Sequence, residues 1–112
     1  KIKNPNNHFF SNCDYKFFLN NFEKQKKPIN FYFYDGEHSY ENQFENLIIA
    51  KEFFIKGTIV LVDDINFKDV EMGTKDFINK YPGQYEILKE IKTANDNCHP
   101  SYWNGVIVFK KI

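Results

Sequence analysis

The sequence predicts one α/β domain with three layers, built on a mostly parallel sheet whose last strand is antiparallel. Two apolar runs, at residues 29–34 and 58–62, have the length and composition of buried strands. The segment between them has a helical period, and the order strand, helix, strand is typical of a right-handed crossover between parallel strands. The runs at residues 85–91 and 103–112 follow one another with no helix between them. That short connection predicts that the last strand is antiparallel.

Local signals place the helices. Ser39 is a suitable N-cap for a helix that is expected to continue to Gly57, a residue type that often follows a helix end. A second helix is expected at about residues 69–81, where Pro82 would end it. An earlier helix is predicted over residues 15–24.

Composition excludes several classes of function. The chain has 112 residues and no net charge, and all fifteen of its basic residues are lysine, which argues against a nucleic-acid partner. No apolar run is long enough for a membrane span or a signal peptide, so we expect a cytoplasmic protein without a membrane partner. The two cysteines, Cys13 and Cys98, have no metal-ligand spacing, which fits a reducing compartment and argues against zinc.

Acidic residues follow both of the central strands. Asp35 ends the first apolar run, and Asp63 with Asp64 ends the second. Parallel neighbouring strands end at the same edge of a sheet, so the three carboxylates are expected to converge. Oxygen ligands suit a hard cation such as magnesium. The alternative interpretation is turn chemistry at Asp35-Gly36 and a solvated loop start at Asp63-Asp64.

With these motifs in order, the sequence resembles the C-terminal half of a class I S-adenosylmethionine-dependent methyltransferase. The resemblance is to the small-molecule O-methyltransferases that have an Asp-Gly-Asp/Glu-His-Ser/Thr-Tyr motif after one strand and Asp-Asp after the next. The matching segments here are residues 35–40, DGEHSY, and 59–64, IVLVDD, with residues 103–110, WNGVIVFK, as the last antiparallel strand. The resemblance implies a three-layer, Rossmann-like fold.

The resemblance also implies roles for individual residues. Asp35, Asp63 and Asp64 correspond to the ligands of a magnesium ion that binds the hydroxyl groups of a small-molecule or sugar substrate. Glu37 stands where some relatives have a general base, and His38 is the neighbouring alternative. Asp14 lies about where relatives have an acid that contacts the adenine of S-adenosylmethionine, but it is equally suited to cap the helix over residues 15–24.

The same resemblance implies that the N-terminal, cofactor-binding half of such a fold is absent. No glycine precedes Gly36, so the chain offers no Gly-rich loop for the cofactor. The strand at residues 31–34 would then lack its usual neighbour, and its bare edge would bind the missing half or a second copy of the chain. Residues 1–112 are therefore interpreted as one partial domain, inactive on its own, with a non-catalytic binding or assembly module as the alternative.

Overall fold

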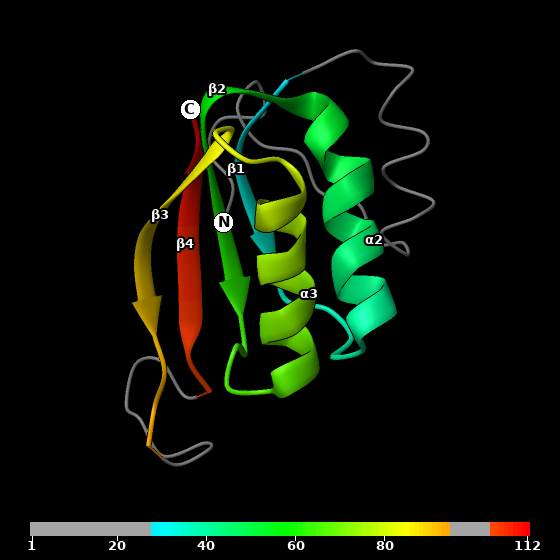
Figure 1. Cartoon of the computed structure of the whole chain (residues 1–112), viewed down its shortest axis with the longest axis vertical. Coiled ribbons are helices and arrows are strands. Elements are labelled where there is room, and N and C mark those ends of the chain that lie inside the picture. Colours follow the sequence, from blue (N-terminus) through cyan, green and yellow to red (C-terminus); the bar gives the residue numbers. More distant parts are fainter. Residues whose placement is uncertain (1–27, 95–103) are drawn as a thin grey trace, which may run out of the picture.

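The computed structural model describes residues 28–94 and 104–112. The elements in chain order are β1(Ile29–Tyr34), α2(Tyr40–Ala50), the short 3-10 helix η2(Lys51–Phe53), β2(Phe54–Asp63), α3(Lys68–Lys80), β3(Tyr85–Ile91) and β4(Val106–Lys111). The strands form one sheet in the order β1-β2-β4-β3 (Figure 1). The predicted helix over residues 15–24 and the candidate adenine ligand Asp14 lie outside the described residues.

The sheet is mixed, and the expectation that it is mostly parallel is wrong for the described strands. β1 and β2 are parallel, whereas β4 is antiparallel to both β2 and β3. The last strand is antiparallel, as predicted. Because it lies between β2 and β3 rather than at an edge, it makes two of the three strand pairs antiparallel.

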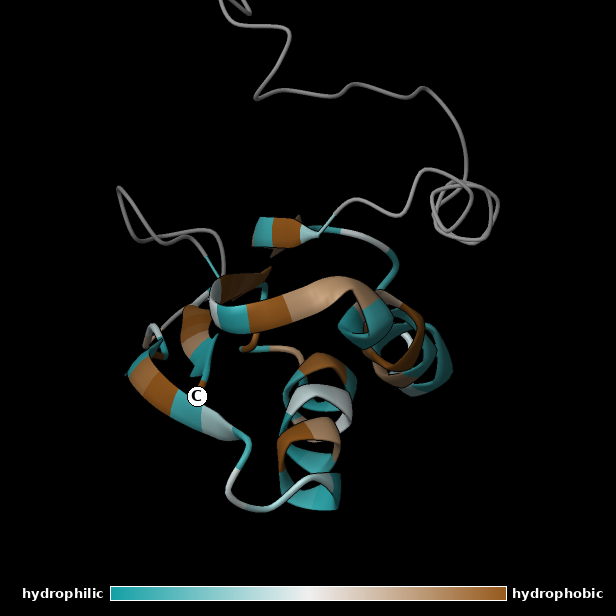
Figure 2. Cartoon of the chain, turned by 90° about the horizontal axis from the view of Figure 1, so that it is seen from above, coloured by the Kyte–Doolittle hydropathy of each residue, from teal (hydrophilic) through white to brown (hydrophobic). Residues whose placement is uncertain are grey.

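Both helices cover the same face of the sheet (Figure 2). The core lies between the two layers, where side chains of β2 and β4 meet those of α2 and α3; its fully buried members include Val60, Val62, Ile107, Phe109, Leu47 and Phe77. The described residues thus form two layers, and the third layer predicted from the sequence is not found among them.

The opposite face of β1 is open within the described structure. Side chains alternate along a strand, so Tyr32 and Tyr34 face the helices while Phe31 and Phe33 face away. Phe31 is 58% exposed and Phe33 is 52% exposed. They lie beside Ile59 and Leu61 of β2, their partners in the parallel register. Together these four side chains form an apolar surface, which we call the open face.

Helix α2 ends earlier than the sequence predicts. The Lys51 backbone N–H closes the helix on carbonyls of its last turn, and the chain enters β2 at Phe54. Gly57, with φ of 95°, lies in an irregular part of β2 and does not cap the helix. Thr58 stabilises this irregularity because its hydroxyl accepts from the Ile55 N–H at 2.8 Å and donates to the Ile29 carbonyl at 2.6 Å. Gly57 therefore marks a bulge in the strand.

The second helix agrees with the prediction to within one residue at each end. Gly73 in its middle is buried against α2, and a Cβ atom there would lie 3.0 Å from the side chain of Gln43. The glycine therefore lets the two helices approach closely. No helix in the described parts of the chain has the length and apolarity needed to cross a membrane.

Ion pairs fasten α3 to the end of β3. Glu71 accepts from Lys75 at 3.0 Å and from Lys92 at 2.7 Å, and Lys75 also contacts Glu90 at 2.7 Å. The side-chain hydrogen bonds from Lys92 and Lys75 lower the pKa of Glu71 below its ordinary value of 4.5. The ionised form of Glu71 is thus favoured in the folded protein.

We expect Glu71→Gln to lower the free energy of unfolding at pH 7 by about 0.5–1 kcal/mol, the range of well-formed surface ion pairs. The pKa of Glu71 is depressed in the folded protein, so this contribution is complete above pH 4.5, the ordinary pKa of a glutamate. It is lost as the pH falls through the lower pKa of the folded protein. Urea unfolding of both proteins from pH 7 to pH 3 measures the difference. Glu86→Gln, which alters a longer pair of 3.9 Å with Lys110, is the control. An undiminished difference at pH 3 would contradict the assignment.

Candidate metal centre

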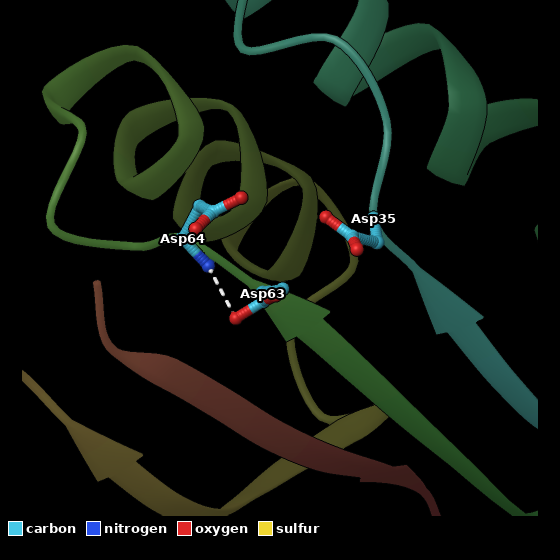
Figure 3. A group of neighbouring side chains, drawn as sticks. All are labelled: Asp35, Asp63 and Asp64. Atoms are coloured by element: carbon cyan, nitrogen blue, oxygen red, sulfur yellow. Dashed lines mark hydrogen bonds between the residues drawn. The ribbon is translucent and has the colours of Figure 1, made fainter. Parts of the chain in front are cut away.

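The acidic cluster Asp35, Asp63 and Asp64 lies where β1 and β2 end. Tyr34 pairs with Val62 in the parallel register, so the next residues, Asp35 and Asp63, lie side by side at this edge of the sheet. One carboxylate oxygen from each of the three residues lies within 4.8 Å of the others (Figure 3). The predicted convergence of the three carboxylates is confirmed.

The turn after β2 directs Asp64 toward Asp35. Asp64 has φ of 66°, the left-handed conformation that aspartate and asparagine tolerate better than most residues. Its backbone N–H donates to the Gly105 carbonyl and to Oδ1 of Asp63, both at 2.9 Å. Consecutive residues normally project from opposite faces of a strand, so this turn is what allows both carboxylates to join one cluster.

The start of β4 supports this turn from the other side. The Asn66 N–H donates to the Asn104 carbonyl at 2.7 Å, and the Asn66 side chain exchanges hydrogen bonds with Thr93. Gly105, with φ of 88°, leaves no room for a side chain, because a Cβ atom would lie 2.7 Å from the Ile91 carbonyl oxygen. The turn that carries Asp64 is therefore held by residues far away in the sequence.

Crowding changes the acidity of the cluster. Burial, followed by the charge of Asp64, raises the pKa of Asp35 above its usual value of 3.8. The same two causes raise the pKa of Asp63. Removal from water and mutual repulsion both disfavour the charged carboxylates. The neighbouring His38 opposes these effects only in part, and a bound cation would relieve the remaining repulsion.

The donor set fits a hard divalent cation. All three groups are carboxylates, Asp35 is exposed, and the other two are half-buried, so oxygen ligands and solvent are both available. Magnesium prefers this combination because it binds through few carboxylates and keeps several waters.

The structure separates the two candidate bases. His38 contacts the cluster, with Nε2 lying 2.9 Å from Oδ2 of Asp64. Glu37 is exposed, and one of its carboxylate oxygens accepts a hydrogen bond from the side chain of Asn42 in the first turn of α2. Glu37 thus stands beside the cluster in the same loop without joining it.

Two residues at the cluster were not anticipated from the sequence. The ring of Phe67 stacks on His38 with centroids 4.3 Å apart, and the Asn104 side-chain amide donates to Oδ1 of Asp64 at 3.4 Å. A signal for Asn104 existed, because an antiparallel last strand must begin beside the end of β2. Phe67 gave no such signal, since an apolar residue before a helix is normally read as part of the core.

No protein-family model matches the chain, and no curated protein does either. The interpretation of the site therefore rests on its own geometry and on the motifs that form it.

We expect Asp63→Asn to stabilise the metal-free protein by about 1 kcal/mol, because it removes one of three crowded charges. Asparagine keeps the side-chain oxygen that accepts from the Asp64 N–H, so the turn is preserved. Thermal unfolding in the presence of a chelator measures the effect. Asp69→Asn, at an exposed position in the first turn of α3, is the matched control and should give no gain. Equal or lower stability of Asp63→Asn would show that repulsion in the cluster is negligible.

Proposed function

We propose that the chain is the C-terminal part of an S-adenosylmethionine-dependent, magnesium-assisted O-methyltransferase that acts on a hydroxylated small molecule or sugar. The observation that carries the proposal is the convergence of Asp35, Asp63 and Asp64 at the ends of two parallel strands. Their strands end in the two motifs that resemble this group of enzymes, DGEHSY and DD. If these acids served only as turn residues, there would be no reason for the two motifs to lie next to one another.

The direction of the last strand supports the proposal. The resemblance implies an α/β domain whose last strand is antiparallel, and β4 has this direction. In the proposal, the four described strands belong to the sheet of a larger three-layer, Rossmann-like domain. The protein is proposed to be cytoplasmic. A cofactor-binding half completes that sheet beside β1, and Asp14 contributes to the adenine site. Methyl transfer is accordingly expected only from a protein that contains both halves.

The chemistry divides between the cluster and its neighbours. Asp35, Asp63 and Asp64 would hold magnesium, which when bound favours loss of the proton from a substrate hydroxyl group. S-Adenosylmethionine would supply the methyl group. Glu37 is assigned the role of general base because it is exposed beside the cluster and is oriented by Asn42. The hydroxyl proton would pass to Glu37, and the substrate oxygen would bond to the methyl carbon as the carbon–sulfur bond breaks and S-adenosylhomocysteine leaves.

His38 is the less suitable base in this arrangement. Its ring is stacked on Phe67 and its Nε2 contacts Asp64, so both contacts hold His38 against the cluster. Glu37 can move toward a substrate by exchanging a single side-chain hydrogen bond. The proposal therefore places the proton on Glu37 and leaves His38 an orienting role.

We expect magnesium to raise the melting temperature of the chain, since at a concentration of 100 Kd a ligand of the folded state adds about 2.7 kcal/mol. Asp63→Asn should abolish this shift because it removes one of three charged ligands. The shift is measured by thermal unfolding with magnesium chloride and with a chelator, and the affinity by titration calorimetry. Asp69→Asn should retain the full response. A wild-type chain that is indifferent to magnesium would count against the metal site and the proposed reaction.

A second function is favoured by the edge of the sheet. β1 is an edge strand in the described sheet, and Phe31 and Phe33 of the open face are more than half exposed. Exposed apolar side chains on an edge strand are typical of surfaces that recruit another strand. The alternative function is therefore a non-catalytic binding or assembly module, with β1 and the open face as its interface.

For this alternative we expect the wild-type chain to form a dimer and Phe33→Lys to make it monomeric, because a buried charge opposes contact across the open face. Light scattering coupled to size-exclusion chromatography over a range of concentrations gives the mass. Leu88→Lys, at a position 46% exposed on β3, places the same charge on the opposite edge strand and should leave the dimer intact. A monomeric wild-type chain at high concentration would exclude self-assembly through β1.

A further inference from the structure

Side chains link the two loops that carry the acidic cluster. Residues 35–39 connect β1 to α2 and residues 64–67 connect β2 to α3, and they are far apart in the sequence. His38 of the first loop contacts both Asp64 and Phe67 of the second. The link therefore joins the loop of Asp35 to the loop of Asp64, which directly follows Asp63.

The hydrogen bond between His38 and Asp64 has a defined direction. An ionised carboxylate oxygen can only accept, so we assign the hydrogen in this 2.9 Å contact to Nε2 of His38. The other oxygen of Asp64 accepts from the Asn104 amide. Each oxygen of Asp64 therefore has a donor of its own, and these contacts orient the carboxylate in the ligand-free protein.

The ring of His38 needs the support of Phe67. The His38 side chain is 45% exposed, so packing from its own loop does not fix it. The Phe67 ring lies almost parallel to it, at 19° and 4.3 Å between centroids. Phe67 is itself anchored, because it packs against the core and its backbone N–H donates to the Asp64 carbonyl at 3.1 Å. Phe67 thereby restricts rotation of the imidazole.

We infer that His38 and Phe67 are positioning residues of the cation site, which together orient Asp64 toward Asp35 and Asp63. This inference rests on the proposed function, because it assigns the pair a role in binding the cation. Groups that donate hydrogen bonds to metal-binding carboxylates reduce the cost of ordering them when the ion binds. Neither residue touches the substrate in this assignment. Their effect is on affinity for the ion, and it is present without substrate or S-adenosylmethionine.

The test is the affinity of the 112-residue chain for magnesium, measured by titration calorimetry on a set of variants. His38→Ala removes both contacts and should weaken binding about 10–100-fold, the usual cost of losing such support. His38→Gln places an amide donor near the position of Nε2 and should bind more tightly than His38→Ala. Phe67→Leu keeps apolar bulk but loses the ring stack, and should weaken binding about tenfold. Phe67→Tyr keeps the stack and should bind as the wild type does.

Controls separate a positioning role from a merely structural one. Phe44→Leu removes a different aromatic stack, that of Tyr40 with Phe44 in α2, and should leave the affinity unchanged. Circular dichroism confirms that each variant is folded before titration. In the metal-free wild type, a long-range proton–nitrogen NMR spectrum should show the hydrogen of His38 on Nε2. Phe67→Leu should remove the upfield shift that the Phe67 ring causes in the His38 ring protons.

The outcomes distinguish the two proposals. Wild-type binding together with losses in His38→Ala and Phe67→Leu supports the positioning role. Wild-type binding with the same affinity in both variants would overturn this inference and leave the proposed function standing. A wild-type chain that does not bind magnesium would overturn both. A hydrogen found on Nδ1 in place of Nε2 would also overturn this inference, because the bond to Asp64 would then be absent.

Discussion

The parallel pairing of β1 with β2 is the interaction on which the candidate site depends. Its register places Tyr34 beside Val62, and this alone brings the residues that follow, Asp35 and Asp63, to one edge of the sheet. Helix α2 makes the pairing possible by returning the chain to the start of β2. The buried side chains between sheet and helices keep the strands aligned, so packing energy from the core opposes the repulsion of the carboxylates.

Much of this arrangement could be predicted from the sequence because its signals are local. The aromatic run at residues 29–34 becomes β1 without error, and Ser39 caps α2 through its side chain as expected. The predicted end of α2 was wrong because a glycine such as Gly57 is suited both to the end of a helix and to a bulge in a strand. The contacts of Thr58 with Ile55 and with the start of β1 favour the bulge.

The errors at larger scale come from contacts that sequence patterns do not encode. Sequence patterns do not indicate which strands pair with β4. Its position between β2 and β3 makes the sheet mixed rather than mostly parallel. The convergence of the three acids followed from strand direction alone and is confirmed. The orientation of Asp64 did not follow from it, because that orientation depends on the left-handed turn at Asp64 and on contacts with Asn104 and His38.

The left-handed conformation of Asp64 also limits which substitutions this position accepts. A carboxylate with a longer side chain, such as glutamate, would keep the charge, but it adopts positive φ less readily than aspartate or asparagine. Glycine would satisfy the backbone but would remove the carboxylate. Very few residue types therefore combine a carboxylate with this backbone conformation. In a library of variants, position 64 should be among the least permissive in the chain, although its side chain remains partly open to solvent.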